Sequence, residues 1–138
     1  MSVYRLIDHT ADCGIEVEAA DASDLFAGTA RAMFELLATA PGPPDGLVDA
    51  IDITGTDWTD LMINWLRELL YLFNAKQRVV REIRITALDP QRIAARLTCD
   101  RLDPQRHELG DEIKAVTYHQ ASVTADGDRW TARIIFDV

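Results

Sequence analysis

The chain has 138 residues, 48% of them hydrophobic and 27% charged, which is enough apolar surface for the core of one domain and too much for a disordered chain. Its 23 acidic and 14 basic residues give a formal net charge of −9, and a surface of that sign repels the phosphate backbone of nucleic acids. This composition disfavours direct, high-affinity nucleic-acid binding. It favours divalent cations, or a partner protein with a basic face, as ligands.

The sequence gives no sign of a membrane or secreted protein. No stretch approaches the ~20 apolar residues of a membrane-spanning helix, and residues 1–5 lack the apolar region of a signal peptide. We therefore expect a cytoplasmic protein without a membrane partner. Cys13 and Cys99 lie in no Cys-x-x-Cys pattern, so we expect two reduced core residues rather than a disulfide or a zinc site.

The first elements are predicted to be two strands and a helix. Residues 3–7 are an apolar run and residues 13–19 alternate apolar with polar side chains, which is typical of a pair of strands with one solvated face. Asp21 or Ser23 then caps a helix that ends before the three prolines of residues 41–46. Its apolar positions recur with a period near 3.6: Leu25, Phe26, Met33, Phe34 and Leu37.

A strand and a second helix follow. Residues 48–54 alternate as a strand does, and Thr56 or Asp57 caps the helix. Residues 80–88 and 92–99 are rich in β-branched side chains and predict an antiparallel pair. The apolar stripe of the second helix is broad: Leu61, Met62, Trp65, Leu66, Leu69 and Phe73.

The rest of the chain predicts a loop and a hairpin. Residues 100–111 are polar and form a loop long enough to suggest function. Residues 115–124 and 129–138 flank Asp126-Gly127, a dipeptide suited to tight hairpin turns. The fold class is therefore α+β: one domain over residues 1–138, a two-layer sandwich with a mixed, largely antiparallel sheet and two helices packed on one face.

Two clusters of carboxylates stand out. The connection from Asp8 through His9 to Asp12 holds two carboxylates and an imidazole, and carboxylate oxygens are the ligands of hard cations. In the alternative interpretation, both acids satisfy the backbone of a turn and His9 makes a structural hydrogen bond. At the other end, Asp137 is followed by the α-carboxylate of Val138. If the last strand pairs centrally, its end is held firmly, and Asp12 beside it would complete an all-oxygen cation site.

The segment before the final hairpin holds further candidates. Lys114 can balance the carboxylates or meet a partner's phosphate, and the alternative is a solvated lysine at a strand edge. His119 is more typical of a half-buried hydrogen-bonding residue than of a base. No glycine-rich phosphate loop, nucleophile elbow or spaced Cys-His pair is present, so nothing predicts covalent catalysis.

The sequence resembles the archease family over essentially its whole length. The resemblance is specific because two motifs, at residues 8–15 and 114–119, occur in this order and an acidic residue stands one place from the end. Cys13 and Val138 stand where the family more often has Ile. The segments that carry the resemblance are Asp8-His9-Thr10-Ala11-Asp12-Cys13-Gly14-Ile15, the leucine-rich helix of residues 57–71, Ile113-Lys114-Ala115-Val116-Thr117-Tyr118-His119, and Asp137-Val138.

The resemblance implies an accessory protein and not an enzyme. Archeases are similar in fold to a two-layer α+β sandwich and assist RtcB-type GTP-dependent RNA ligases in tRNA splicing and RNA repair. Such a ligase joins RNA ends through a histidine-GMP intermediate, using GTP and a divalent metal. Archease is thought to promote guanylylation of the ligase and so to permit multiple turnover.

The resemblance also implies site residues. By matching positions, the metal site falls on Asp12, Asp137 and Val138, with Ca²⁺ as the expected cation and Mg²⁺ or Mn²⁺ equally able to bind oxygen ligands. The functional neighbours are Lys114, His9, Asp8 and His119. Two other functions stay open: a chaperone-like modulator of a tRNA methyltransferase, and a metal-dependent hydrolase that uses His9 and the carboxylates.

Overall fold

The computed structural model describes residues 3–8 and 12–138. Its strands form two main antiparallel sheets and one short ladder. The four-stranded sheet has the order β1-β2-β9-β8 and the three-stranded sheet the order β4-β6-β5. The strands of the four-stranded sheet are β1 (Val3–Asp8), β2 (Asp12–Ala19), β8 (Ala115–Asp126) and β9 (Arg129–Asp137). Those of the other sheet are β4 (Leu47–Thr54), β5 (Arg78–Asp89) and β6 (Arg92–Arg101).

Both helices begin at an aspartate cap. The carboxylate of Asp21 accepts the Asp24 N–H at 2.8 Å, and that of Asp57 accepts the Asp60 N–H at the same distance. Each carboxylate satisfies an amide that the first helical turn leaves unpaired. Of the two caps predicted for each helix, Asp21 and Asp57 are therefore the ones used. The helices are α1 (Ala22–Leu37) and α2 (Trp58–Asn74).

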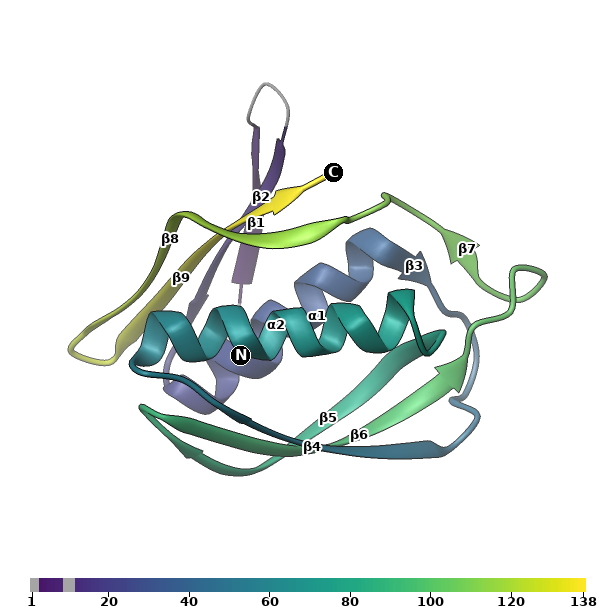
Figure 1. Ribbon diagram of the computed structural model, residues 1–138, viewed down its shortest axis with the longest axis horizontal. Coiled ribbons are helices and arrows are strands. Elements are labelled where there is room, and N and C mark those ends of the chain that lie inside the picture. The colour runs from purple at the N-terminus through teal and green to yellow at the C-terminus, as the bar shows by residue number, and fades with distance from the viewer. Residues whose placement is uncertain (1–2, 9–11) are drawn as a thin grey trace.

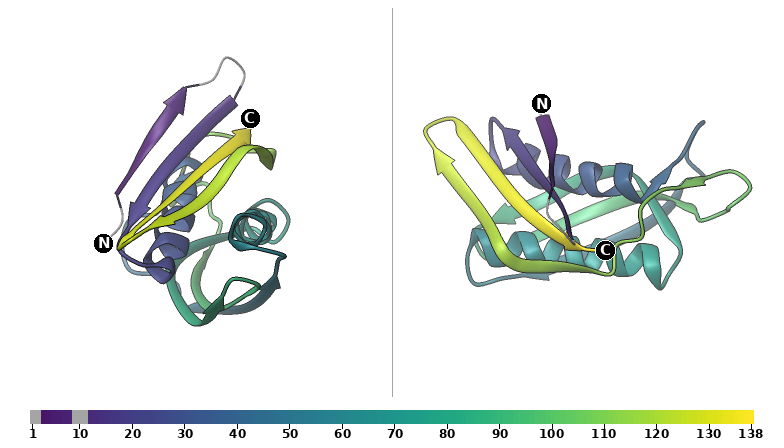
Figure 2. Two further views of the ribbon diagram at one scale, coloured as in Figure 1. Left: turned by 90° about the vertical axis from the view of Figure 1, so that its left-hand side faces the viewer. Right: turned by 90° about the horizontal axis from the view of Figure 1, so that it is seen from above.

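The two helices lie in one layer between the two main sheets (Figures 1 and 2). Helix α1 contacts β2 and β9 on one side and β5 on the other, and α2 contacts β8 on one side and β4 and β5 on the other. The indole N–H of Trp65 donates to the carbonyl of Phe26 at 3.0 Å and joins the helices. One cluster of buried hydrophobic side chains therefore draws on both helices and both sheets.

The α+β class, the antiparallel pairing and the two helices are confirmed, and each main sheet carries helices on one face only. The sequence did not indicate that the strands divide between two sheets that share a single helix layer. Alternation of apolar and polar side chains indicates that one face of a strand is buried, but it does not indicate which sheet the strand joins.

The predicted loop after β6 is partly structured. Strand β6 continues to Arg101, and the short strand β7 (Glu108–Leu109) pairs with β3 (Ala38–Thr39), which directly follows α1. A Cβ on Gly110 would lie 2.2 Å from the carbonyl oxygen of Leu36, so only glycine allows this approach. The loop is thus fastened to the end of α1 before it enters β8.

Strand β8 is interrupted by a bulge. Thr117 pairs with Ile135 and Ser122 with Arg133. Between these two pairs β9 advances by only two positions, so residues 118–121 of β8 are extra residues that form the bulge. Gln120 takes a positive φ of 53° within the bulge. The interruption divides β8 into an initial segment, beside the C-terminus, and the hairpin at Gly127.

No helix in the described part of the chain is long and apolar enough to cross a membrane.

Candidate functional site

The ends of β2 and β9 meet at one edge of the four-stranded sheet. Asp12, the first residue of β2, is the antiparallel partner of Asp137, the last residue of β9. Residues paired in this way lie about 5 Å apart between their Cα atoms. Strand β9 is central in the sheet, because β8 pairs with its other side and places Ala115 opposite Asp137. The condition set by the sequence analysis, a last strand that pairs centrally, is therefore met, and the backbones of Asp12 and Asp137 lie side by side.

The end of β9 is firmly held although its side chains are exposed. Phe136 is fully buried, whereas Asp137 is exposed and Val138 is 42% exposed. The amide of Lys114 donates to the carbonyl of Asp137 at 2.7 Å. The carboxylate of Asp137 therefore reaches solvent from a fixed backbone, with the exposed Val138 next to it. We call this edge, formed by Asp12, Asp137 and Val138, the C-terminal edge.

Helix α2 fastens the start of β8 beside this edge. The guanidinium of Arg67 donates from Nε to the carbonyl of Val116 at 3.1 Å, and the Asn74 amide donates to the carbonyl of Ile113 at 3.2 Å. Arg67 and Asn74 are seven positions apart, two turns of a helix, so they lie on one face of α2. The backbone of Lys114 is thereby held between them.

Tyr118 extends the same array. Its ring lies under the Arg67 guanidinium, with 4.8 Å from Cζ to the ring centroid, and its hydroxyl donates to the carboxylate of Asp60. This hydrogen bond, with the Thr56 N–H as a second donor, lowers the pKa of Asp60, and it raises the pKa of Tyr118. The ionised acid, the phenol and the guanidinium thus form a connected row along α2.

A groove of ≈ 460 Å³ runs between α2 and the initial segment of β8, directly beside the C-terminal edge. Leu70 and Val116 are almost completely buried and form apolar parts of its lining, while Tyr71 is 50% exposed. We call it the α2–β8 groove. Its lining residues are Arg67, Leu70, Tyr71, Asn74, Lys114, Ala115 and Val116.

The structure does not bring every predicted site residue to this place. Lys114 lies there through its backbone bond to Asp137, and His119 is exposed within the β8 bulge. His9 lies outside the described residues, and Asp8 is placed only through its pairing with Cys13. The residues that are described contain no group of three or more metal-binding side chains.

The donor set at the C-terminal edge nevertheless fits a hard cation. Asp137 supplies an exposed carboxylate, and the register puts Asp12 on the adjacent strand. Both residues carry oxygen donors, the kind that Ca²⁺ and Mg²⁺ select. A cation bound there would neutralise negative charge at this edge.

A buried acid and histidine were missed from the sequence. Asp100 and His107 are 0% and 2% exposed, and His107 Nε2 lies 2.9 Å from the Asp100 carboxylate. Because His107 Nδ1 accepts the Asp103 N–H at 2.9 Å, it carries no proton there, and Nε2 must be the donor to Asp100. The local signal was weak, since a histidine in a polar loop gives no periodic pattern.

Two further hydrogen-bond donors and one more cation surround the Asp100 carboxylate. The Arg81 guanidinium lies at 2.7 Å, the Asp45 N–H at 2.7 Å and the Arg106 guanidinium at 3.6 Å. Burial opposes ionisation of Asp100, but the His107, Asp45 and Arg81 donors outweigh it and lower its pKa to about 2. This cluster joins the loops before β4 and after β6, so we assign it to structure and not to catalysis.

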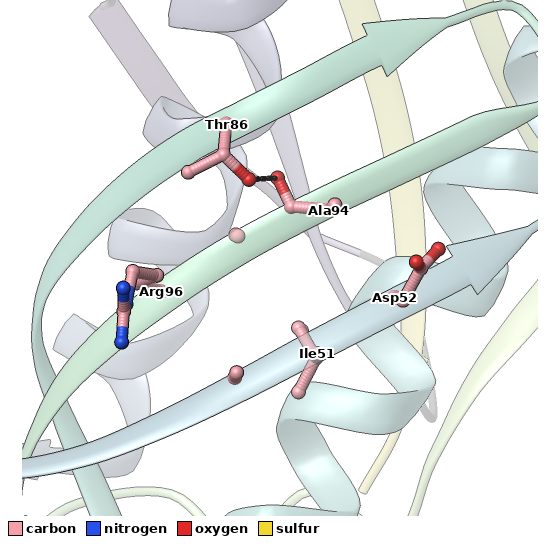
Figure 3. A pocket seen from close by; sticks show the side chains of 7 residues that line it. Ile51, Asp52, Thr86, Ala94 and Arg96 are labelled. Atoms are coloured by element: carbon pink, nitrogen blue, oxygen red, sulfur yellow. Dashed lines mark hydrogen bonds between the residues drawn. The ribbon is translucent and has the colours of Figure 1, made fainter.

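The outer face of the three-stranded sheet has a separate shallow hollow (Figure 3). Its polar groups are already engaged: the Asp52 carboxylate pairs with Arg92 at 2.7 Å, and the Thr86 hydroxyl donates to the Ala94 carbonyl at 3.2 Å. Arg96 stands at its margin. The hollow gathers no acid-base pair, so it is a weaker candidate site than the C-terminal edge.

Neither cysteine contributes a disulfide. Cys13 lies on β2 and Cys99 on β6, in different sheets. Burial, together with the Asp49 carboxylate, raises the pKa of Cys99 to about 12, so this thiol stays protonated and unreactive. Cys99 is a core residue as predicted, whereas Cys13 is half-buried.

Fold and site together define a class: a small α+β domain in which two antiparallel sheets enclose a pair of helices and polar residues gather at one sheet end. Residues 4–138 match the archease protein family. The chain belongs to this family.

Relatives and solved structures agree with that assignment. Protein archease of Methanosarcina barkeri is 30% identical over 139 residues, covering 98% of this chain and 95% of the relative. Protein archease of Pyrococcus abyssi is 28% identical over the full length of both chains. The solution structure of protein 1598 of Methanobacterium thermoautotrophicum has a TM-score of 0.77 at 26% identity, covering 98% of each chain. The Thermotoga maritima archease, described as a possible chaperone, shares the fold, with a TM-score of 0.67 at 20% identity over 96% of this chain and 94% of the other.

Proposed function

We propose that this chain is a metal-binding accessory protein that activates an RtcB-type GTP-dependent RNA ligase, as its family resemblance implies, and that it is not itself an enzyme. One observation carries the proposal: Asp12 and Asp137 are direct partners across β2 and β9, beside the exposed chain end. The residues that the resemblance assigns to the metal thus lie together in the fold.

The proposed role uses the charge of the C-terminal edge. A ligase that binds GTP and RNA ends needs a basic, phosphate-binding cleft, and a surface of net charge −9 is attracted to such a cleft. Asp137 and the terminal carboxylate would enter it with Asp12, hold a divalent cation and favour loading of the ligase with GMP. The cation would supply charge neutralisation at phosphate oxygens.

The relatives' names give no enzymatic activity, and the arrangement at the edge agrees with a role without catalysis. A hydrolase would need a nucleophile or a positioned base near the carboxylates. The base that this interpretation needs, His9, lies outside the described residues. The hydrolase interpretation therefore gains no support from the described residues.

The test is to mix the chain with an RtcB-type ligase from the same organism, GTP and a divalent metal. We expect faster formation of ligase-GMP and RNA joining beyond one turnover. Asp137→Asn removes one carboxylate charge with little change of shape, and should abolish most of the stimulation. Asp126→Asn, in the hairpin that joins β8 to β9 at the opposite end of β9, is the matched control and should stimulate normally.

Two outcomes would contradict the proposal. With a competent ligase, absence of stimulation by the unchanged chain would favour the modulator of a tRNA methyltransferase. Full stimulation by both Asp12→Ala and Asp137→Asn would show that the C-terminal edge is not the acting site.

A further inference from the structure

The α2–β8 groove differs in chemistry from the C-terminal edge beside it. Its exposed lining side chains include two cations, Arg67 and Lys114, and the half-exposed Tyr71. The half-exposed ring of Tyr118, which does not line the groove, lies under Arg67. Tyrosine and arginine are the residues that dominate binding energy at protein interfaces. The charged residues that line the groove are both cations, and no acidic residue within the described ranges lines it.

The groove is also rigid. Arg67 and Asn74 donate hydrogen bonds to the carbonyls of Val116 and Ile113, which fasten the start of β8 to α2. The ammonium group of Lys114 has no ion-pair partner among the residues that the structure describes. A groove whose two walls are already joined loses little backbone entropy when a partner binds.

We infer that the α2–β8 groove is a docking site for an acidic segment of the ligase, with an apolar side chain seated against Leu70 and Tyr71 and a carboxylate placed at Lys114. The inference rests on the proposed function. It assigns Lys114 to the partner protein, not to the metal or the nucleotide.

Charge complementarity argues for this occupant. A nucleotide would bring several phosphate charges to a groove that offers Lys114 and an already engaged Arg67, close to Asp137 and the terminal carboxylate. A segment with one or two carboxylates beside an apolar residue meets less repulsion and also covers the apolar lining. An acidic edge next to a groove lined by two cations would orient the chain, with the edge toward a basic cleft of the ligase and the groove against the proposed acidic segment.

The experiment measures binding of the full chain to the ligase by biolayer interferometry, without GTP and without divalent metal. We expect Tyr71→Ser and Lys114→Glu each to raise Kd by about tenfold or more, the loss typical of an interface hot spot. Tyr71→Phe keeps the ring and should bind like the unchanged chain. The matched controls lie on the outer face of the three-stranded sheet: Val48→Ser and Arg96→Glu should leave Kd unchanged.

A second measurement separates docking from the action of the edge. At saturating concentrations the Tyr71 and Lys114 variants should reach the normal plateau of ligase guanylylation, because excess protein compensates for weak docking. Asp137→Asn should stay low at every concentration. Thermal unfolding of each variant checks that it is folded.

Each result decides the matter. Unchanged Kd for both groove variants overturns the groove but leaves the proposed function standing. Absence of binding by the unchanged chain overturns both. Tight binding of GTP to the chain alone, lost in Tyr71→Ser, would make the groove a nucleotide site, and a large effect of Arg96→Glu would move the docking surface to the three-stranded sheet.

Discussion

The buried ion pair at Asp100 shows how single residues stabilise the region that leads to the candidate site. His107 holds one tautomer, because Nδ1 accepts a backbone amide and Nε2 donates to Asp100. Removing one member of such a cluster leaves the others buried without a partner, which typically costs about 3–5 kcal/mol. The loop that these residues fasten continues through Gly110 to Lys114, so its order bears on the α2–β8 groove.

The lowered pKa of Asp100 predicts a pH dependence of folding. Its folded pKa is about 2 against an ordinary 3.8, so the stability that the ionised carboxylate contributes is present above 3.8 and lost as pH falls toward 2. The shift corresponds to about 2 kcal/mol. In Asp100→Asn, which lacks this group, urea unfolding should show a flatter loss of stability between pH 5 and pH 2.

An exposed ion pair provides the control. Arg92 lowers the pKa of Asp52 through a hydrogen bond, but both side chains are solvated, so solvent screens the pair. Asp52→Asn should therefore keep almost the full acid-induced loss of stability. An Asp100→Asn curve that runs parallel to that of the unchanged chain would contradict the structural account of the buried cluster.

At the scale of an element, α2 does the most to define the site, because it fastens β8 and forms one wall of the groove. Its C-terminal end lacks the glycine that usually ends a helix. Instead Gln77 adopts a φ of 56°, and its carbonyl accepts the Leu102 N–H at 2.8 Å. A side chain in this left-handed conformation costs roughly 1 kcal/mol relative to glycine.

Replacing Gln77 with glycine should therefore stabilise the protein. We expect Gln77→Gly to raise the free energy of unfolding by up to about 1 kcal/mol, less the entropy that glycine adds to the unfolded chain. Equilibrium urea unfolding would measure the change. Lys76→Gly, one position earlier and without a positive φ, should instead destabilise, and equal effects of the two variants would contradict this assignment.

At the scale of the whole molecule, the charge of −9 should govern encounter with the ligase. If the acidic C-terminal edge approaches a basic cleft, attraction speeds association, and salt screens that attraction. Raising the ionic strength from about 0.05 to 0.5 M should slow association by about tenfold or more, while the dissociation rate changes less. Stopped-flow fluorescence would follow the rates, and a rate independent of salt would argue against electrostatic steering.

Several elements were predictable because their signals are local. The cap at Asp57, the apolar stripe of α2 and the turn at Gly127 each depend on neighbouring residues, and all three are present. The bulge at residues 118–121 and the short β3–β7 ladder were not predicted. Both depend on contacts between segments far apart in the sequence, which leave no periodic pattern.

The candidate site, like the fold, was predictable from the sequence only in part. The sequence by itself determined the α+β class, the two helices and the residues that carry the family resemblance, since local patterns and chemical types are written in the chain. Only the tertiary structure decided that Asp12 and Asp137 are partners, that two sheets share one helix layer, and that Arg67 and Asn74 hold Lys114 beside the chain end. Strand order and register arise from packing across the whole core, and a linear sequence does not state which distant strands will pair.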